Sequence, residues 1–92
     1  MQERDWQYGT ALTASGVIKA APGTLKKLVI NVHSSGVIRL WDNASAASGT
    51  SFGGQMTLNA GERIVEVGPV YFKNGIYLEL VSGTANITPV YL

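Results

Sequence analysis

The segment GVIRLWDNAS, residues 36–45, predicts a β-strand that runs directly into a polar turn. Large apolar side chains alternate on both of its faces, because Ile38 and Leu40 share one side while Trp41 lies on the other. Arg39 is the only charge before the turn. A strand of this kind needs cover on two sides, and a small domain has its own core on one side only. We therefore expect a partner surface to cover the second side.

The composition of the chain favours a single small domain that associates with other proteins. A domain of 92 residues buries roughly 60–65% of the surface that its unfolded chain exposes. Only 14% of the residues are charged, against about 25% in ordinary soluble domains. Cysteine is absent, which excludes disulfides and thiolate metal sites and fits a reducing cytoplasm. A thin core under a weakly charged surface favours assembly over a free monomer.

Charge and hydropathy argue against two classes of partner. The net charge is +1 and the basic residues are scattered apart from Lys26-Lys27, so we predict no binding to nucleic acid. The longest apolar runs, such as residues 28–30, are far shorter than the roughly 20 residues of a membrane-spanning helix, so we predict no membrane partner. Residues 1–5 carry mixed charge, which argues against a cleaved secretion signal.

Strand-forming and turn-forming residues alternate at short spacing, and no window carries the apolar stripe of an amphipathic helix. The sequence therefore predicts an all-β protein. We expect antiparallel hairpins at Ser34-Ser35-Gly36 and at Asn74-Gly75, and further turns at 68–69 and 82–83. The expected strands cover residues 16–20, 25–33, 36–41, 55–59, 63–67, 70–73, 76–81 and 85–92.

About seven or eight short strands with Gly-rich turns predict a small antiparallel β-sandwich or jelly-roll-like domain. We expect residues 1–14 to form an amino-terminal arm and residues 15–92 to form the sandwich. Residues 43–54 predict an extended loop or a crossover between sheets, and Pro89 places the last strand at an edge or a bulge. The expected core consists of Ile18, Leu28, Ile30, Val32, Ile38, Leu40, Val65, Val67, Ile76, Leu78 and Leu80.

The titratable residues form no recognisable catalytic or metal-binding motif. A metal site would need His33, the one histidine, to meet carboxylates that no spacing in the sequence brings to it. We assign it a structural role at the end of a strand. Glu62 and Glu66 share a face of their strand, but only the fold could bring them together as a hydrolytic pair. We therefore expect a non-enzymatic protein with no cofactor and no metal.

Aromatic and apolar side chains outside the expected core form a candidate protein interface. Asp42 and Asn43 predict a turn after Trp41. The alternative is a sugar-stacking platform, with Trp41 as the ring and the two polar residues beside it. Trp6 and Tyr8 lie in the arm, and we expect them to dock on their own domain or on a neighbour. The candidate interface residues are Trp6, Tyr8, Val37, Arg39, Trp41, Ile64 and Tyr77.

Several segments together resemble small virion proteins of tailed bacteriophages. They are residues 15–20, 22–25, 36–45, 72–77 and 85–92, and the resemblance covers nearly the whole chain. It implies a head decoration, or cement, protein: a small β-sandwich that is assembled in the host cytoplasm, sits on the outer head surface as a homotrimer and clamps adjacent subunits of the major capsid protein. The alternative within this group is a fibre or tail module that binds carbohydrate.

Overall fold

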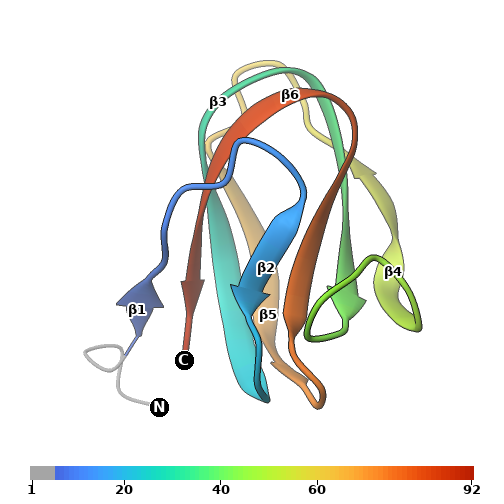
Figure 1. Ribbon diagram of the computed structural model, residues 1–92. Helices are drawn as coiled ribbons and strands as arrows, with labels where there is room; N and C mark the ends of the chain where they lie inside the picture. The colour runs from blue at the N-terminus through green and yellow to red at the C-terminus, as the bar shows by residue number, and fades with distance from the viewer. Residues whose placement is uncertain (1–5) are drawn as a thin grey trace.

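The computed structural model describes residues 6–92, which form one antiparallel β-sheet without a helix (Figure 1). Its six strands are β1 (Gln7–Tyr8), β2 (Gly16–Lys19), β3 (Gly23–Asp42), β4 (Thr50–Thr57), β5 (Ile64–Phe72) and β6 (Ile76–Tyr91). The all-β prediction is confirmed, but the strands are fewer and longer than the roughly seven or eight expected. In the part of the chain that the structure describes, no helix is long and apolar enough to cross a membrane.

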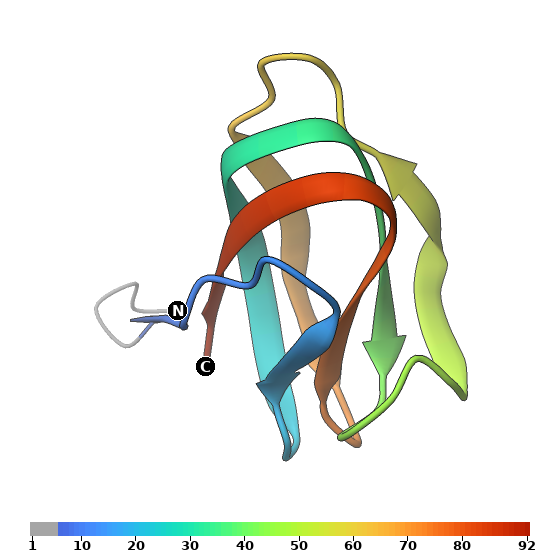
Figure 2. The ribbon, with the colours of Figure 1, turned by 45° about the horizontal axis from the view of Figure 1, so that its top comes forward.

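Strands β3 and β6 pair with each other along most of their length and bend together halfway (Figures 1 and 2). At the bend, Ser35 of β3 has a φ of 51° and Gly83 of β6 has a φ of 76°. Pairing continues through the bend, with Ser34 opposite Thr84. The hairpin predicted at residues 34–36 is therefore wrong, and so is the turn predicted at residues 82–83 of β6. Both are bends inside continuous strands, where a residue in the left-handed region kinks the ladder without ending it.

The bend divides the sheet into two halves. In the first half, the start of β3 pairs with β5 and with the end of β6, and β1 lies on the far side of β6. In the second half, the end of β3 pairs with β4 and with the start of β6, and β2 lies on the far side of β6. Figure 2 shows β3 and β6 arching over the molecule from one half to the other. Buried side chains of both halves form one cluster, so the sheet is folded over a single core.

Three connections differ from those predicted. Asn74-Gly75 joins β5 to the start of β6, yet these two flanking segments pair with different halves of β3 and not with each other. The turn thus carries the chain between the halves, and the predicted hairpin is wrong. Residues 43–49 join β3 to its paired neighbour β4, so they form a hairpin loop rather than a crossover. Gly68-Pro69 lies inside β5, opposite a register shift between Leu25 and Lys27 of β3.

The core contains ten of the eleven predicted residues, six of them buried and four partly buried. Val32 is the exception, because its side chain is 64% exposed. The register of β3 against β6 shifts between Ile30 and Val32, so the alternation of inward and outward side chains breaks before the bend. The buried apolar residues that the prediction omitted are Leu25, Leu58, Phe72, Ala85, Ile87 and Val90.

The amino-terminal segment lies along β6, so β6 is not an edge strand. Strand β1 pairs with the end of β6, and Leu12 forms an isolated bridge with Ile87 of β6. Pro89 is buried in this strand, and its carbonyl accepts a hydrogen bond from the Gly9 amide at 2.9 Å. A residue's N–H and C=O point to the same side of a strand, so the missing N–H of Pro89 faces Gly9 in the amino-terminal segment and leaves the ladder with β3 intact.

Candidate functional site

The outer surface of the second half carries four of the seven predicted interface residues. Trp41 of β3 is directly opposite Tyr77 of β6, and Val17 of β2 lies on the other side of Tyr77. Arg39 is directly opposite Glu79 in the same way. The side chains that alternate with them along β3 and β6 point into the core, so this set faces outward. We call this surface the Arg39 face, which consists of Val17, Val37, Arg39, Trp41, Tyr77 and Glu79.

Trp41 contacts both charged side chains of the Arg39 face, Arg39 and Glu79. The guanidinium of Arg39 lies over the indole ring, with its central carbon 5.4 Å from the ring centroid. The indole Nε1–H donates a hydrogen bond to Oε1 of Glu79 at 3.0 Å. Within residues 6–92, no ion pair joins Arg39 to Glu79, and the Arg39 Nε is buried without a hydrogen-bond partner. The two charges are thus adjacent but are not neutralised by direct contact.

The outer surface of the first half carries the other three predicted residues. Tyr8 is 73% exposed and Ile64 is 46% exposed, and the unpredicted Tyr71 is 65% exposed. Trp6 lies near Tyr8, with the Lys26 Nζ 5.5 Å from the centroid of its indole ring. The Nε1 of Trp6 is buried and makes no hydrogen bond within the described residues. We call this surface the Tyr8 face, which consists of Trp6, Tyr8, Lys27, Ile64, Glu66 and Tyr71.

The predicted interface residues therefore lie on two separate surfaces. Because the core lies between the halves, the Arg39 face and the Tyr8 face point away from each other. Val17, Tyr71 and Glu79 also lie on these two faces, and the prediction did not name them. Glu79 could have been found, since it follows Tyr77 by two positions in a strand and so shares its face. The position of Glu79 opposite Arg39 could not have been predicted, because that pairing depends on the register of two segments far apart in the sequence.

The polar residues after Trp41 build two different turns. The side-chain oxygen of Asn43 accepts hydrogen bonds from the amides of Ser45 at 2.8 Å and Ala46 at 3.0 Å, as an Asx turn does. The carboxylate of Asp42 instead accepts bonds from the amides of Lys73 at 3.2 Å and Asn74 at 2.7 Å. Asp42 therefore ties the end of β3 to the turn that carries the chain between the two halves.

Replacing Asp42 by alanine is expected to lower the free energy of unfolding by about 1–2 kcal/mol, because two backbone amides lose a charged acceptor. Urea denaturation of the purified variant measures this loss. Asp42→Asn keeps one acceptor oxygen and should lose about half as much. Equal stability of Asp42→Ala and the natural chain would show that these two hydrogen bonds do not stabilise the turn.

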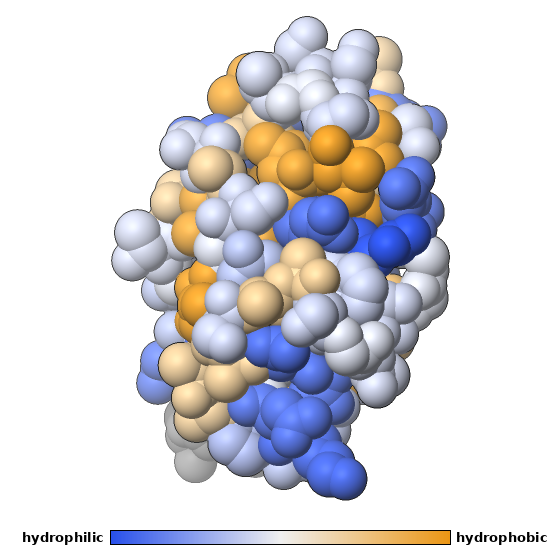
Figure 3. Space-filling model, turned by 45° about the vertical axis from the view of Figure 1, so that its right-hand side comes forward, coloured by the Kyte–Doolittle hydropathy of each residue, from blue (hydrophilic) through white to orange (hydrophobic). Residues whose placement is uncertain are grey.

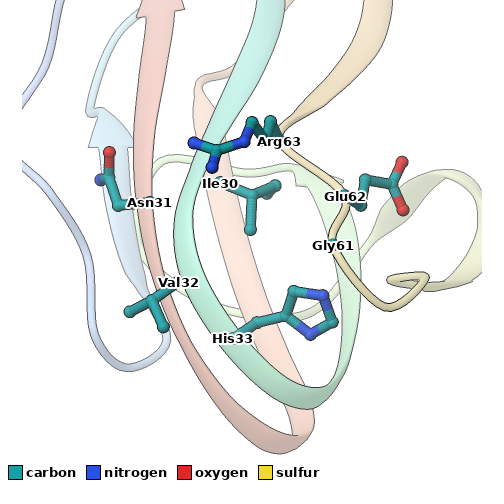
Figure 4. Close-up of a pocket in the computed structure, with 7 residues that line it drawn as sticks. All are labelled: Ile30, Asn31, Val32, His33, Gly61, Glu62 and Arg63. Atoms are coloured by element: carbon teal, nitrogen blue, oxygen red, sulfur yellow. The ribbon is translucent and has the colours of Figure 1, made fainter.

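A hollow of about 200 Å³ lies near the bend, between β3 and the loop before β5 (Figure 4). His33 points toward this loop, where its Nε2 donates to the carbonyl of Asn59 at 2.7 Å. Its Nδ1 accepts a weak bond from the Gly36 amide at 3.4 Å. Because both ring nitrogens make hydrogen bonds to the backbone, His33 connects the loop before β5 to the bend. The hollow is also smaller than the roughly 300–1,000 Å³ typical of ligand pockets.

The two glutamates considered as a hydrolytic pair have separate roles. Glu62 lies in the loop before β5, and its Oε1 accepts a hydrogen bond from the Asn59 amide at 2.8 Å. Glu66 lies within β5, directly opposite Lys27 of β3. Across residues 6–92, no group of three or more histidine or carboxylate side chains is placed to hold a metal ion.

Apolar surface also reaches solvent on the side of the molecule that carries β4 (Figure 3). Strand β4 pairs with β3 alone, so its other edge has no strand beside it among the described residues. Phe52 and Met56 of β4 are only partly buried where they pack against the core. An open strand edge beside apolar side chains is a surface that other chains can pair with or cover.

No known protein family, curated protein or solved structure matches this chain. The arrangement of its own residues is therefore the basis for a functional assignment.

Proposed function

We propose that this protein is a non-enzymatic structural component of a bacteriophage virion, a decoration or cement protein that binds the outer head shell and stabilises contacts between major capsid subunits. The observation that carries the proposal is the pair of outward faces with exposed or half-buried aromatic side chains. A cement protein must contact at least two neighbours, and faces that point in opposite directions allow this. In this role the folded-over sheet acts as a small β-sandwich with a contact surface on each side.

The Tyr8 face is the better candidate for the shell. Its three most exposed large side chains, Tyr8, Ile64 and Tyr71, are 46–73% exposed in the structure of residues 6–92, and aromatic residues are enriched at the centres of protein interfaces. Trp6 and Lys26 extend this surface with a cation–π pair. A standard interface buries on the order of 800 Å² per partner, and many copies on one shell would add their individually modest affinities.

The alternative function, carbohydrate binding through Trp41, has weaker support. Sugar rings stack on an open aromatic face, but the Arg39 guanidinium lies over the Trp41 ring and Glu79 accepts the bond from its N–H. These two contacts occupy one face of the Trp41 ring and its N–H, which a bound sugar would otherwise contact. A glycan screen that detects binding by the natural chain and none by Trp41→Ala, with folding unchanged, would favour this alternative over the proposed function.

Binding to capsids tests the proposed function. Purified protein is expected to saturate sites on phage capsids that lack it, and to raise the temperature at which those capsids lose their contents. Tyr8→Ser combined with Tyr71→Ser should weaken binding at least about tenfold, the loss expected for aromatic anchors at an interface. Val32→Ser removes an equally exposed apolar residue at the bend and serves as the control. Natural protein that leaves the capsids in the supernatant would refute the proposal.

A further inference from the structure

We propose that a second copy of this chain covers the Arg39 face, with Arg39 of each copy paired to Glu79 of the other across a twofold axis. This inference goes beyond the role on a capsid, because two purified chains suffice for it. It rests on the charges of the face, on their positions in the sheet and on the apolar residues around them.

The charged groups of this face make few contacts within one chain. The guanidinium of Arg39 contacts the Trp41 ring, and no hydrogen bond or ion pair from it is found within residues 6–92. Glu79 accepts one bond through Oε1, which leaves Oε2 open. A guanidinium held against a ring is already oriented, so it binds a carboxylate with little further loss of side-chain entropy. The face thus presents one oriented cation beside one oriented anion.

Their positions make the face complementary to itself. Arg39 and Glu79 are directly opposite each other on β3 and β6, the two inner strands of this half. A twofold axis that lies between two such faces, parallel to the strands and midway between β3 and β6, exchanges the positions of these strands. It therefore places Arg39 over Glu79 of the second copy, and Glu79 over the second copy's Arg39. The same operation places Trp41 over the second copy's Tyr77.

A second copy fits this face better than an acidic or a basic partner. An acidic partner would meet Glu79, and a basic partner would meet Arg39, so either would bring like charges together. The second copy matches both charges at once. Trp41, Tyr77, Val17 and Val37 supply apolar contact, while the two ion pairs fix the register, since a buried ion pair gives specificity more reliably than affinity.

Charge-reversal variants test this pairing in the intact chain. Analytical ultracentrifugation over a series of concentrations should show the natural protein at twice the mass of one chain. Arg39→Glu and Glu79→Arg, each alone, should remain at the mass of one chain, because each would oppose like charges across the axis. Their equimolar mixture should recover the double mass, since both opposed pairs then carry opposite charges. Lys27→Glu, a charge reversal on the Tyr8 face, should behave like the natural protein.

Each outcome has one meaning. Recovery of the double mass by the mixture alone supports the twofold pairing, because a variant that had merely lost its fold would not regain a partner on mixing. Circular dichroism checks that both single variants keep their strands. A natural chain at the mass of one or of three chains overturns the inference, and so does a mixture that stays dissociated. Capsid binding is measured separately, so the pairing and the proposed function can fail independently.

Discussion

Gly83→Ala is expected to lower the free energy of unfolding by at least about 3 kcal/mol, because it combines unfavourable backbone geometry with a steric clash. Gly83 has a φ of 76°, a region that costs a residue with a β-carbon about 1–2 kcal/mol. A β-carbon there would also collide with the carbonyl oxygen of Ser35 and come within 2.6 Å of that of Ser34. Both oxygens belong to the paired strand β3, so relief requires the bend to open.

Gly53→Ala separates these two causes. Gly53 has a similar φ of 67°, but a β-carbon built on it meets no atom within 4 Å. Gly53→Ala should lower the free energy of unfolding by about 1–2 kcal/mol, the backbone cost alone. Urea denaturation of both variants gives the comparison. Equal losses would mean that the bend can relax around a methyl group, and the close approach of β3 to β6 would then not be needed for stability.

Leu40→Ala is expected to cost about 3 kcal/mol, within the range of about 2–5 kcal/mol for truncation of a fully buried leucine. Leu40 has no exposed surface and lies between Phe52 of β4 and Leu78 of β6 in the register of the sheet. The cavity would open in the cluster that joins the two halves, so the midpoints of thermal and of urea unfolding should both fall. A loss below about 1 kcal/mol would show that the halves do not share one tightly packed core.

Val32→Ala is the matched control on the same strand. Its side chain is mostly exposed, so truncation should change stability by no more than about 0.5 kcal/mol. The comparison also tests the correction to the predicted core. Strict alternation would make Val32 as costly to truncate as its neighbour Ile30, whereas the register shift between them predicts a large difference.

The bend matters for function as well as stability. The Arg39 face and the Tyr8 face are outer surfaces of the two halves of one sheet, and β3 and β6 run through both halves. The bend at Ser35 and Gly83 brings the two halves together over the core, so that their outer surfaces point in opposite directions (Figure 2). A chain with an opened bend would keep its strands but would lose the opposed arrangement through which one surface is proposed to bind the shell and the other a second copy.

The errors at the turns share one cause. Ser34-Ser35-Gly36 and Asn74-Gly75 have the composition of hairpin turns, and each does change the direction of the chain. A hairpin also requires that the flanking segments pair with each other. In this protein the segments around 34–36 both pair with β6, and those around 74–75 pair with different halves of β3. Local sequence encodes the change of direction but not the pairing partner.

Alternating side chains and their chemistry were sufficient for the all-β class, for most of the core and for the outward positions of Arg39, Trp41 and Tyr77, because a strand's period of two residues is a local property. The tertiary structure alone decided that β3 and β6 are continuous, that Val32 is exposed and that Arg39 meets Glu79. It also placed the predicted interface residues on two opposed faces. These features depend on register between segments about 40 residues apart, where one shifted residue reverses which side chains face the core.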